Sequence, residues 1–296
     1  MIKVVKNITD MQKISLEHKL KGDKIAVVPT MGFLHEGHLS LIRKAREFTE
    51  SVVTTLFVNP SQFGPNEDYN RYPRNFERDL DLCNQAGSKY LFNPEVLDMY
   101  PKGFNTSIKI SGVTDKFEGE FRPGHFDGVA TVVAKLFNST LPDYAVFGQK
   151  DYQQTLLIKK LTKDLNFPIE IVIAPTIREI DGLAMSSRNT YLDIEIRKKA
   201  GVLFYALNEA RKIISEGETN RLRINTSLHK ALRTIPEIKI DYAASALADT
   251  LDEPESFFPG DSVVILIAAY LGKTRLIDNE IVKIPYKLNE ENFIIT

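Results

Sequence analysis

The apolar residues at the start of the chain alternate between short continuous runs and runs with helical spacing. IAVV (25–28) is typical of a buried strand, and apolar residues then recur at helical spacing from Leu34 to Phe48. VVTTLFV (52–58) is rich in β-branched residues and ends at an Asn-Pro pair. A strand, a helix and a strand within about 35 residues predict a βαβ unit with parallel strands and a right-handed crossover.

The same alternation continues further along the chain. Helical spacing between Val129 and Phe137 leads into YAVF (144–147), and helical spacing between Leu157 and Leu165 leads into IEIVIA (169–174). Repeated alternation of strands and helices predicts an α/β fold with an open, doubly wound, Rossmann-like parallel sheet.

The pattern changes near Pro175. Residues 194–216 hold a single helical face, and they are followed by three strand-like segments without intervening helices: IKIDYA (238–243), VVILIAAY (263–270) and the short TRLID (274–278). Helices followed by strands predict a smaller α+β C-terminal domain. We therefore expect two domains, residues 1–176 and residues 177–296.

Composition and charge narrow the range of functions. The 38 basic and 39 acidic residues give a net charge of −1, which argues against electrostatic binding to nucleic acid or to an anionic membrane. The single cysteine, Cys83, excludes an internal disulfide and a thiolate metal cluster. The longest apolar stretch, Val263 to Leu271, is too short to span a bilayer. We expect a soluble, cytoplasmic protein.

The segment PTMGFLHEGH (29–38) lies between the first predicted strand and the following helix. Open α/β sheets bind ligands at the carboxyl ends of their strands, which is where this segment lies. A helix N-terminus attracts anions. Gly32 and Gly37 allow a close backbone approach, and His35 and His38 share one helix face. This arrangement favours a polyphosphate ligand. A metal-binding histidine pair and a purely structural capping role remain as alternatives.

Two further segments carry candidate phosphate-binding groups. GQKD (148–151) follows a predicted strand, so Lys150 is placed to reach a phosphate and Asp151 a ribose hydroxyl or the helix N-cap. One of the next glutamines, Gln153 or Gln154, is a candidate substrate ligand. MSSRN (185–189) combines two hydroxyls with a guanidinium, which suits a phosphate clamp. A solvated turn and a serine helix cap are the respective alternatives.

Three segments offer weaker signals. FVNPSQFGPNED (57–68) is a polar, tightly turned loop after a strand and a candidate substrate lip that contains Gln62. RPGHF (122–126) forms a turn in which we expect His125 to be structural. The mixed-charge run from Arg71 to Asp79 predicts a solvated helix face, with a metal–phosphate role for Asp79 as the alternative.

Taken together and in order, these motifs resemble the pantoate–β-alanine ligase family of the cytidylyltransferase-like nucleotidyltransferases. The resemblance rests on PTMGFLHEGH, FVNPSQFGPNED, RYPR, EGEFRPGHFDGV, GQKDYQQ, DGLAMSSRN and TRLIDN, and it covers about residues 2–280. The tail after about Ile281 looks longer than the family usually needs.

The resemblance implies a two-step reaction with ATP and Mg²⁺. The carboxylate of pantoate attacks the α-phosphate to give pantoyl adenylate and pyrophosphate, and the amine of β-alanine then displaces AMP to give pantothenate. It also implies a nucleotidyltransferase-type Rossmann-like sheet, small-molecule partners and a homodimer formed through the N-terminal domain. VTTLF (53–57) and RPGHF are the expected interface segments.

The resemblance also implies roles for individual residues. The expected catalytic residues are His35, His38 and Lys150, and Gln62 and Gln154 are expected to bind pantoate and β-alanine. Asp79 is a weaker candidate for the Mg²⁺ environment. The expected ATP-binding residues are Met31, Gly32, His35, His38, Gly148, Gln149, Lys150, Asp151, Ile177, Met185, Ser186, Ser187 and Arg188.

Two other classes of function remain as alternatives at the level of sequence. One is a nucleotidyltransferase that passes AMP or CMP to a phosphate or an alcohol. The other is a nucleotide-binding regulator that has lost catalysis, although His35, His38, Lys150 and Arg188 are all present.

Overall fold

The computed structural model describes residues 2–286. The chain divides into two compact units: the first runs to Arg178 and includes Met185–Ser187, and the second comprises Glu179–Ala184 and the residues from Arg188 onward. The expectation about a long tail falls mainly on residues 287–296, which lie outside the described residues.

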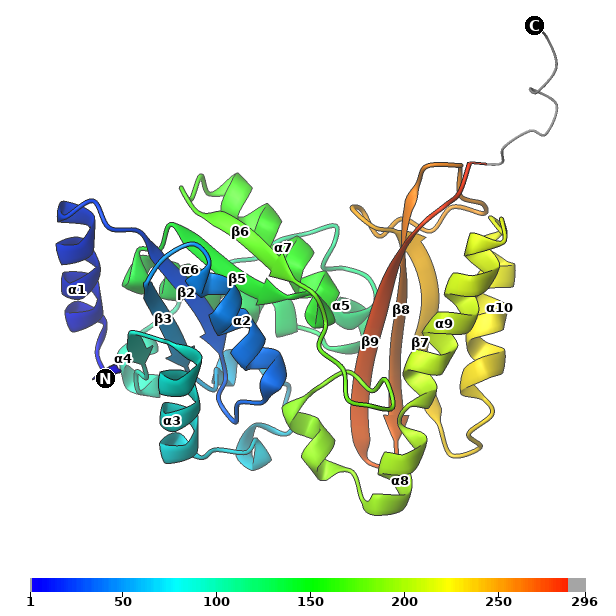
Figure 1. Cartoon of the computed structure of the whole chain (residues 1–296), viewed down its shortest axis with the longest axis horizontal. Coiled ribbons are helices and arrows are strands. Elements are labelled where there is room, and N and C mark those ends of the chain that lie inside the picture. The colour runs from blue at the N-terminus through cyan, green and yellow to red at the C-terminus, as the bar shows by residue number, and fades with distance from the viewer. Residues whose placement is uncertain (1, 287–296) are drawn as a thin grey trace, which may run out of the picture. The chain divides into compact units, whose positions relative to one another are not determined.

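The first unit is built on a six-stranded sheet in which every strand pairing is parallel. The strand order is β1-β4-β3-β2-β5-β6 (Figure 1). The predicted doubly wound α/β sheet is therefore confirmed. The strands are β1 (Lys3–Val5), β2 (Ile25–Thr30), β3 (Ser51–Leu56), β4 (Tyr90–Phe92), β5 (Tyr144–Gly148) and β6 (Glu170–Ala174).

Helices cover both faces of this sheet because alternate side chains of each strand point to opposite faces. On β2, Val27 joins an apolar core with side chains of α1, α6 and α7, whereas Ala26 and Val28 join a second core with side chains of α2 and α3. The helical elements are α1 (Ile8–Leu20), α2 (Glu36–Arg46), η1 (Pro60–Gln62), η2 (Tyr69–Arg71), α3 (Phe76–Ala86), α4 (Val96–Met99), α5 (Glu118–Phe121), α6 (His125–Thr140), η3 (Gln149–Asp151) and α7 (Tyr152–Asp164).

Strand β3 lies in the interior of the sheet, between β2 and β4. All of its residues are buried, from Ser51 to Leu56, and Phe57 directly after it is buried as well. The prediction that VTTLF (53–57) forms a subunit interface is therefore wrong, because these side chains are already buried within the unit itself.

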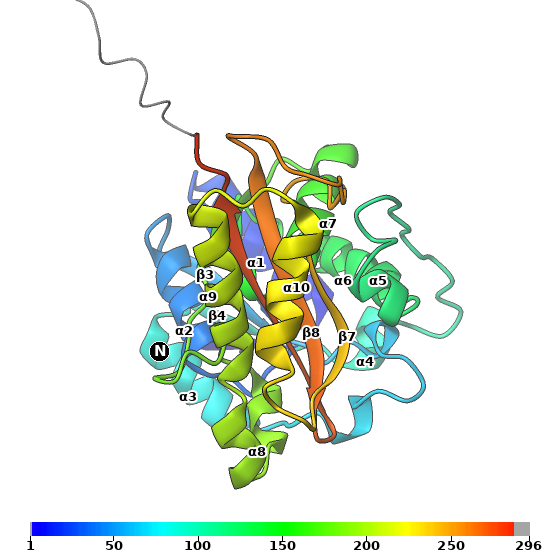
Figure 2. The same cartoon turned by 90° about the vertical axis from the view of Figure 1, so that its right-hand side faces the viewer.

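The second unit contains a three-stranded antiparallel sheet with the order β7-β8-β9. Helix α9 packs along β9 and helix α10 along β7, so both cover the same face of the sheet (Figure 2). The predicted α+β character of this part is confirmed. The elements are η4 (Ser187–Tyr191), α8 (Ile194–Lys199), α9 (Val202–Ser215), α10 (Arg221–Leu232), β7 (Lys239–Leu247), β8 (Ser262–Leu271) and β9 (Thr274–Lys283).

Two predictions in this part were wrong in detail. The expected single helix over 194–216 is divided into α8 and α9, with Gly201 as the N-cap residue of the second helix. A Cβ at Gly201 would lie 3.0 Å from the backbone oxygen of Asp181, so the missing side chain at this position allows the two segments to approach closely. The expected short strand TRLID is the start of the ten-residue strand β9.

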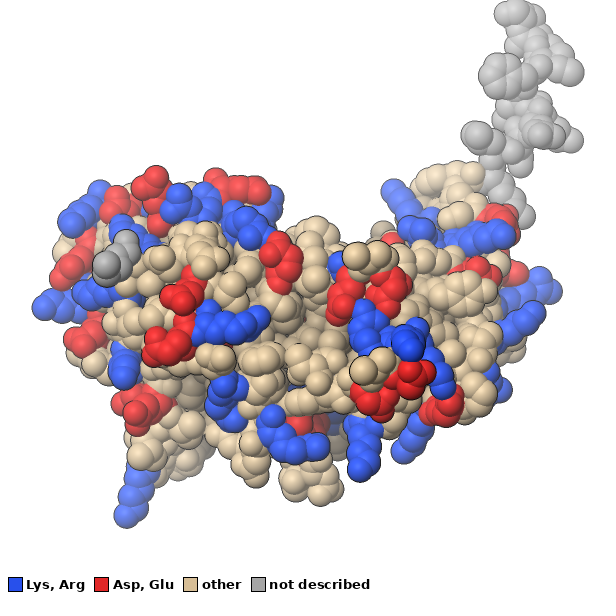
Figure 3. All heavy atoms as spheres, turned by 60° about the horizontal axis from the view of Figure 1, so that its bottom comes forward, with Lys and Arg blue, Asp and Glu red and all other residues tan. Residues whose placement is uncertain are grey.

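In the described part of the chain, no helix has both the length and the apolar character needed to cross a membrane. Basic and acidic side chains are interspersed over the face displayed in Figure 3. This mixture agrees with the nearly balanced charge of the sequence.

Candidate active site

Four of the predicted site segments follow four adjacent strands of the first unit. Strand β3 leads to Gln62, β2 to His35, β5 to Lys150 and β6 to Ile177. Because parallel strands end at the same edge, these segments meet at the carboxyl edge of the sheet. Strand β3 lies on one side of β2 and β5 on the other, so the edge between β2 and β5 is a topological switch point, where open α/β sheets bind ligands.

The loop between β2 and α2 (residues 31–35), which we call the histidine loop, has an unusual backbone. Gly32 and Phe33 have φ angles of 87° and 49°, so two consecutive residues are left-handed. The loop then enters α2 with His35 as the N-cap residue. Nδ1 of His35 accepts the Gly37 amide at 3.2 Å, and Nδ1 of His38 accepts the His35 amide at 3.3 Å. The two rings thus form a reciprocal capping box with their centroids 4.0 Å apart.

These bonds assign the tautomers of both histidines. A nitrogen that accepts a backbone N–H carries no proton, so each neutral ring carries its proton on Nε2. Burial lowers the pKa of His38 well below 6.5, and His35 and Lys150 lower it further. At neutral pH His38 is an uncharged hydrogen-bond donor. The Nδ1 atoms therefore have the structural capping role that was one of the alternatives for this pair. A ligand would be bound through the Nε2–H groups.

Lys150 lies in η3, directly after β5. Its Nζ atom lies 3.4 Å from Oδ1 of Asp151, and its charge acts on the pKa of His38. The β5 strand pairs with β2 through Ala26 and Val27, which brings the GQKD segment and the histidine loop to neighbouring positions on the sheet edge. The structure thus brings together a cation and two N–H donors, as an anionic ligand requires.

Gln62 lies beside the histidine loop. Its Nε2 group contacts Sδ of Met31 at 3.2 Å, and its Oε1 atom accepts a hydrogen bond from Asn59 at 3.1 Å. A residue predicted to bind pantoate, Gln62, therefore lies next to a residue predicted to bind ATP, Met31. Asn59 was not among the predicted site residues, and its signal in the sequence is its position at a strand end directly before Pro60.

A second group of residues, of which only His125 was expected to be structural, holds the segment that contains Gln62. Arg122 forms a bidentate ion pair with Glu67, with N–O distances of 2.7 and 2.8 Å. Nη1 of Arg122 also donates to Nε2 of His125 at 3.0 Å, and Nδ1 of His125 lies 2.8 Å from the Gln62 carbonyl oxygen. Burial and the Arg122 charge lower the pKa of His125 to about 4. We call Glu67, Arg122 and His125 the arginine network.

The structure separates the roles of the two glutamines at the start of α7. Gln153 is buried, donates from Nε2 to the carbonyls of Val113 and Lys116, and accepts the amide of Glu118. All of its amide group is engaged in holding the 113–118 segment. Gln154 is partly exposed and has no such contact among the described residues.

The segment MSSRN (185–189) also contacts the histidine loop, through Ser187. Met185 donates its amide to the Ile177 carbonyl at 3.0 Å, and the buried Ser187 donates its hydroxyl to the Phe33 carbonyl at 3.2 Å. These residues belong to the first unit, whereas Arg188 belongs to the second unit. Ser187 therefore lies at the carboxyl edge, and the roles of Ser186, Ser187 and Arg188 stay predictions.

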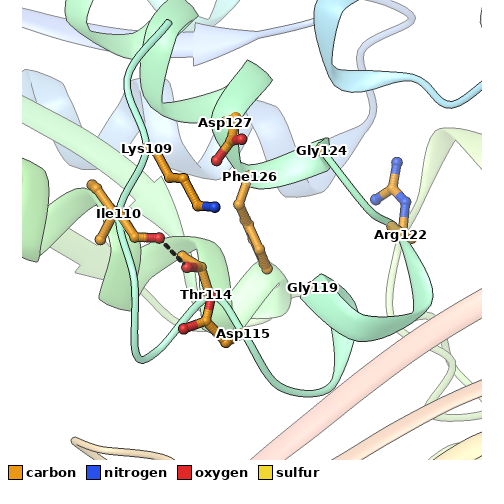
Figure 4. Close-up of a pocket in the computed structure, with 9 residues that line it drawn as sticks. All are labelled: Lys109, Ile110, Thr114, Asp115, Gly119, Arg122, Gly124, Phe126 and Asp127. Carbon is orange, nitrogen blue, oxygen red and sulfur yellow. Dashed lines mark hydrogen bonds between the residues drawn. The ribbon is translucent and has the colours of Figure 1, made fainter.

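A cavity of about 240 Å³ lies outside this set of residues. Its walls come from the segment before α5 and from the start of α6 (Figure 4). Lys109 and Asp127 line it, and Arg122 is its only member of the arginine network. None of the residues predicted as site residues lines this cavity, so it is distinct from the predicted site.

The fold defines an α/β protein with a Rossmann-like parallel sheet, and its candidate site lies at the switch point of that sheet. Residues 3–281 match the model of the family described as pantoate-beta-alanine ligase. The chain is 51% identical over 276 residues to the pantothenate synthetase of Thermoanaerobacter sp. (strain X514), covering 93% of this chain and 97% of that one. It is 50% identical over 281 residues to that of Caldicellulosiruptor saccharolyticus, covering 95% and 99%.

Solved structures give the same result. The pantothenate synthetase of Thermus thermophilus matches with a TM-score of 0.88 and 43% identity, covering 96% of this chain and all of that one. A pantoate-beta-alanine ligase of Francisella tularensis, complexed with beta-gamma ATP and beta-alanine, matches with a TM-score of 0.74 and 34% identity, covering 95% and 97%. The chain belongs to the pantoate–β-alanine ligase family, and the resemblance inferred from the sequence is confirmed.

Proposed function

We propose that this chain is an AMP-forming ligase that uses ATP to condense (R)-pantoate with β-alanine. The observation that carries the proposal is the contact between Gln62, which we predict to bind pantoate, and Met31, which we predict to bind ATP. Family membership supports the same reaction over nearly the whole chain.

In the first step, a carboxylate oxygen of pantoate attacks the α-phosphorus of ATP, and the bond from that phosphorus to the bridging oxygen of pyrophosphate breaks. Negative charge accumulates on the α-phosphoryl oxygens in this step, so charge stabilisation and positioning carry most of the rate. We assign the Nε2–H groups of His35 and His38 and the ammonium of Lys150 to this charge. His38 acts as a neutral donor, because its pKa lies well below 6.5.

In the second step, the amine of β-alanine attacks the acyl carbon of pantoyl adenylate. The bond from that carbon to the AMP oxygen breaks, AMP leaves, and the nitrogen loses a proton. We assign Gln62 and Gln154 to pantoate and β-alanine because a neutral amide can both donate to a carboxylate and accept from a hydroxyl or an ammonium group.

The other residues that we propose to contact the nucleotide come from several segments of the chain. Met31 and Gly32 come from the histidine loop, and Gly148, Gln149 and Asp151 follow β5. Backbone or side-chain groups of Ile177, Met185, Ser186, Ser187 and Arg188 complete the proposed ATP site. In this proposal residues 1–176 bind ATP and pantoate, and residues 177–296 form a lid domain that carries Arg188.

We further propose that Mg²⁺ enters as part of the ATP substrate. Within residues 2–286 there is no group of three or more His, Cys, Asp or Glu side chains that could hold a cation. Magnesium in nucleotide sites is bound largely by substrate phosphates and water, so this composition fits a Mg²⁺–ATP complex better than a resident ion.

The proposal includes a cytoplasmic homodimer. The reduced, buried Cys83 is compatible with a reducing compartment. The dimer rests on the family resemblance alone, and equilibrium sedimentation that gives the mass of one chain would remove it.

The first test is ATP–pyrophosphate exchange with Mg²⁺ in the absence of β-alanine. Exchange that requires pantoate, followed by AMP release when β-alanine is added, would establish both half-reactions. A folded, ATP-binding protein without pantoate-dependent exchange would refute the proposal and would favour a transfer of AMP or CMP to another acceptor.

A further inference from the structure

The carboxylate of Asp79 lies buried beneath the histidine loop. Asp79 is in the first turn of α3, and the residue is only 2% exposed. Its Oδ2 atom accepts the amide of Phe33 at 2.7 Å, and its Oδ1 atom accepts the amide of Leu34 at 2.7 Å. Both distances are short, as expected for hydrogen bonds to an ionised acceptor.

These two amides belong to the part of the loop whose backbone is least favourable. Gly32 and Phe33 are both left-handed, and Phe33 has a side chain, for which this conformation is costly. The turn aims two successive N–H groups at one point, and an anion at that point stabilises them. Asp79 supplies this anion from within the chain.

The loop is also packed closely around the carboxylate. A Cβ at Gly32 would lie 3.1 Å from Oδ2 of Asp79. The Arg78 guanidinium lies over the Phe33 ring at 5.1 Å, and the Ser187 hydroxyl binds the Phe33 carbonyl at 3.2 Å. Two residues after Phe33, the chain reaches His35, which caps α2 and positions His38.

This environment does not fit a metal ligand. Both Asp79 oxygens are engaged by backbone amides, the carboxylate is shielded from solvent, and no cluster of three ligating side chains includes it among the described residues. A direct Mg²⁺ ligand would have to give up these two bonds.

We infer that Asp79 is a positioning residue that holds the Gly32-Phe33 turn, and through it His35 and His38, in the geometry of the nucleotide site. This inference rests on the proposed function for its catalytic meaning, because the turn matters to turnover only if the loop binds ATP. The two hydrogen bonds themselves are independent of that function.

The direct test is amide hydrogen exchange at Phe33 and Leu34, measured by NMR on the full chain. We expect both amides to be protected in the wild type and to exchange at least tenfold faster in Asp79→Asn, because an Asn side chain offers only one acceptor. Asp81→Asn is the matched control, since Asp81 lies on the same helix and is exposed. Wild-type amides that exchange at the unprotected rate would overturn the inference.

The kinetic test separates positioning from metal binding. We expect Asp79→Asn to lower kcat/KM for ATP in ATP–pyrophosphate exchange by 10- to 100-fold, with the half-saturating Mg²⁺ concentration unchanged. Asp79→Glu, which keeps the charge, should restore part of the loss. A raised Mg²⁺ requirement with protected Phe33 and Leu34 amides would show a metal role instead.

The two tests also separate this inference from the proposed function. If the wild type shows no pantoate-dependent exchange, the proposed function fails while the amide measurement still decides whether Asp79 holds the turn. If Asp79→Asn does not fold, the wild-type amides and Asp79→Glu give the same decision.

Discussion

Nδ1 of His125 lies 2.8 Å from the backbone carbonyl oxygen of Gln62, and this contact determines the protonation of the ring. A carbonyl only accepts, so Nδ1 carries the proton and Nε2 is left as the acceptor for Arg122 at 3.0 Å. A second proton would have to replace the Arg122 hydrogen bond. This explains why the Arg122 charge, after burial, lowers the pKa of His125 to about 4.

This relationship predicts a pH dependence of stability. Unfolded His125 titrates near 6.5 and folded His125 near 4, so between these pH values the unfolded chain binds a proton that the native chain does not. The free energy of unfolding should therefore fall as the pH falls from 6.5 to 4, by about 3 kcal/mol from this residue. Below pH 4 its contribution should level off.

Urea unfolding at several pH values checks this prediction. His125→Gln keeps a donor and an acceptor but does not titrate, so its stability should fall less steeply over the same pH range. His38 also has a lowered pKa, and taking the difference between the two proteins removes its contribution. Equal pH slopes for the wild type and His125→Gln would contradict the prediction.

A substitution at Gly128 tests whether the position of η1, which contains Gln62, affects pantoate binding. A Cβ at this position would lie 2.3 Å from the Ser61 carbonyl oxygen and 2.7 Å from Cα of Gln62, both backbone atoms. Gly128→Ala should therefore displace η1, raise the KM for pantoate about tenfold and destabilise the fold by about 1–3 kcal/mol. Steady-state kinetics and thermal unfolding measure the two effects.

The matched control is Gly64→Ala in the neighbouring loop. There the nearest atom to a Cβ is Cγ of Glu67 at 3.7 Å, an ordinary contact, so neither the KM nor the stability should change much. If Gly128→Ala left the KM for pantoate unchanged, the position of η1 would not determine pantoate binding.

The charge-stabilising groups are tested by single substitutions. Lys150→Ala and His38→Asn should each lower the rate of adenylate formation by at least about 100-fold, the range for loss of a transition-state donor. Asn at position 38 keeps an acceptor for the His35 amide but loses the Nε2–H group. Single-turnover adenylation measures the effect, and unaltered adenylation in His38→Asn would refute the role of that donor.

Two controls separate chemistry from folding in this series. Lys159→Ala removes an exposed lysine from α7 and should leave adenylation unchanged. His38→Ala also removes the capping acceptor, so it should cost about 1 kcal/mol of stability beyond the loss of activity.

The elements and the edge that carries the site could be predicted from the sequence because they depend on local patterns. A βα alternation fixes the sheet type, and it places His35 and Lys150 after strands whose carboxyl ends meet. The break at Gly201 was missed because the apolar spacing continues across it, and the close approach of Asp181 to this position involves another segment, which a local pattern does not reveal.

Contacts between distant segments could not be predicted in the same way. Glu67 and Arg122 are 55 residues apart, and nothing in either segment indicates that they form an ion pair. Asp79 lies in a charged run that is typical of a solvated helix face, and it is buried only because the loop after β2 covers the start of α3. These positions depend on tertiary packing.

Gln153 and Gln154 at the start of α7 allow a structural role and a substrate-binding role to be tested separately. Gln153→Ala would leave the Glu118 amide and the carbonyls of Val113 and Lys116 without their partner, so the free energy of unfolding should fall by about 3 kcal/mol. Gln154→Ala should leave stability nearly unchanged and raise the KM for pantoate about tenfold or more, because only the ligand loses its hydrogen bonds. Chemical unfolding and steady-state kinetics on both variants measure the contrast. A stability loss in Gln154→Ala together with a pure KM effect in Gln153→Ala would mean that the two roles are reversed, and equal effects in both variants would mean that neither residue is dedicated to the substrate.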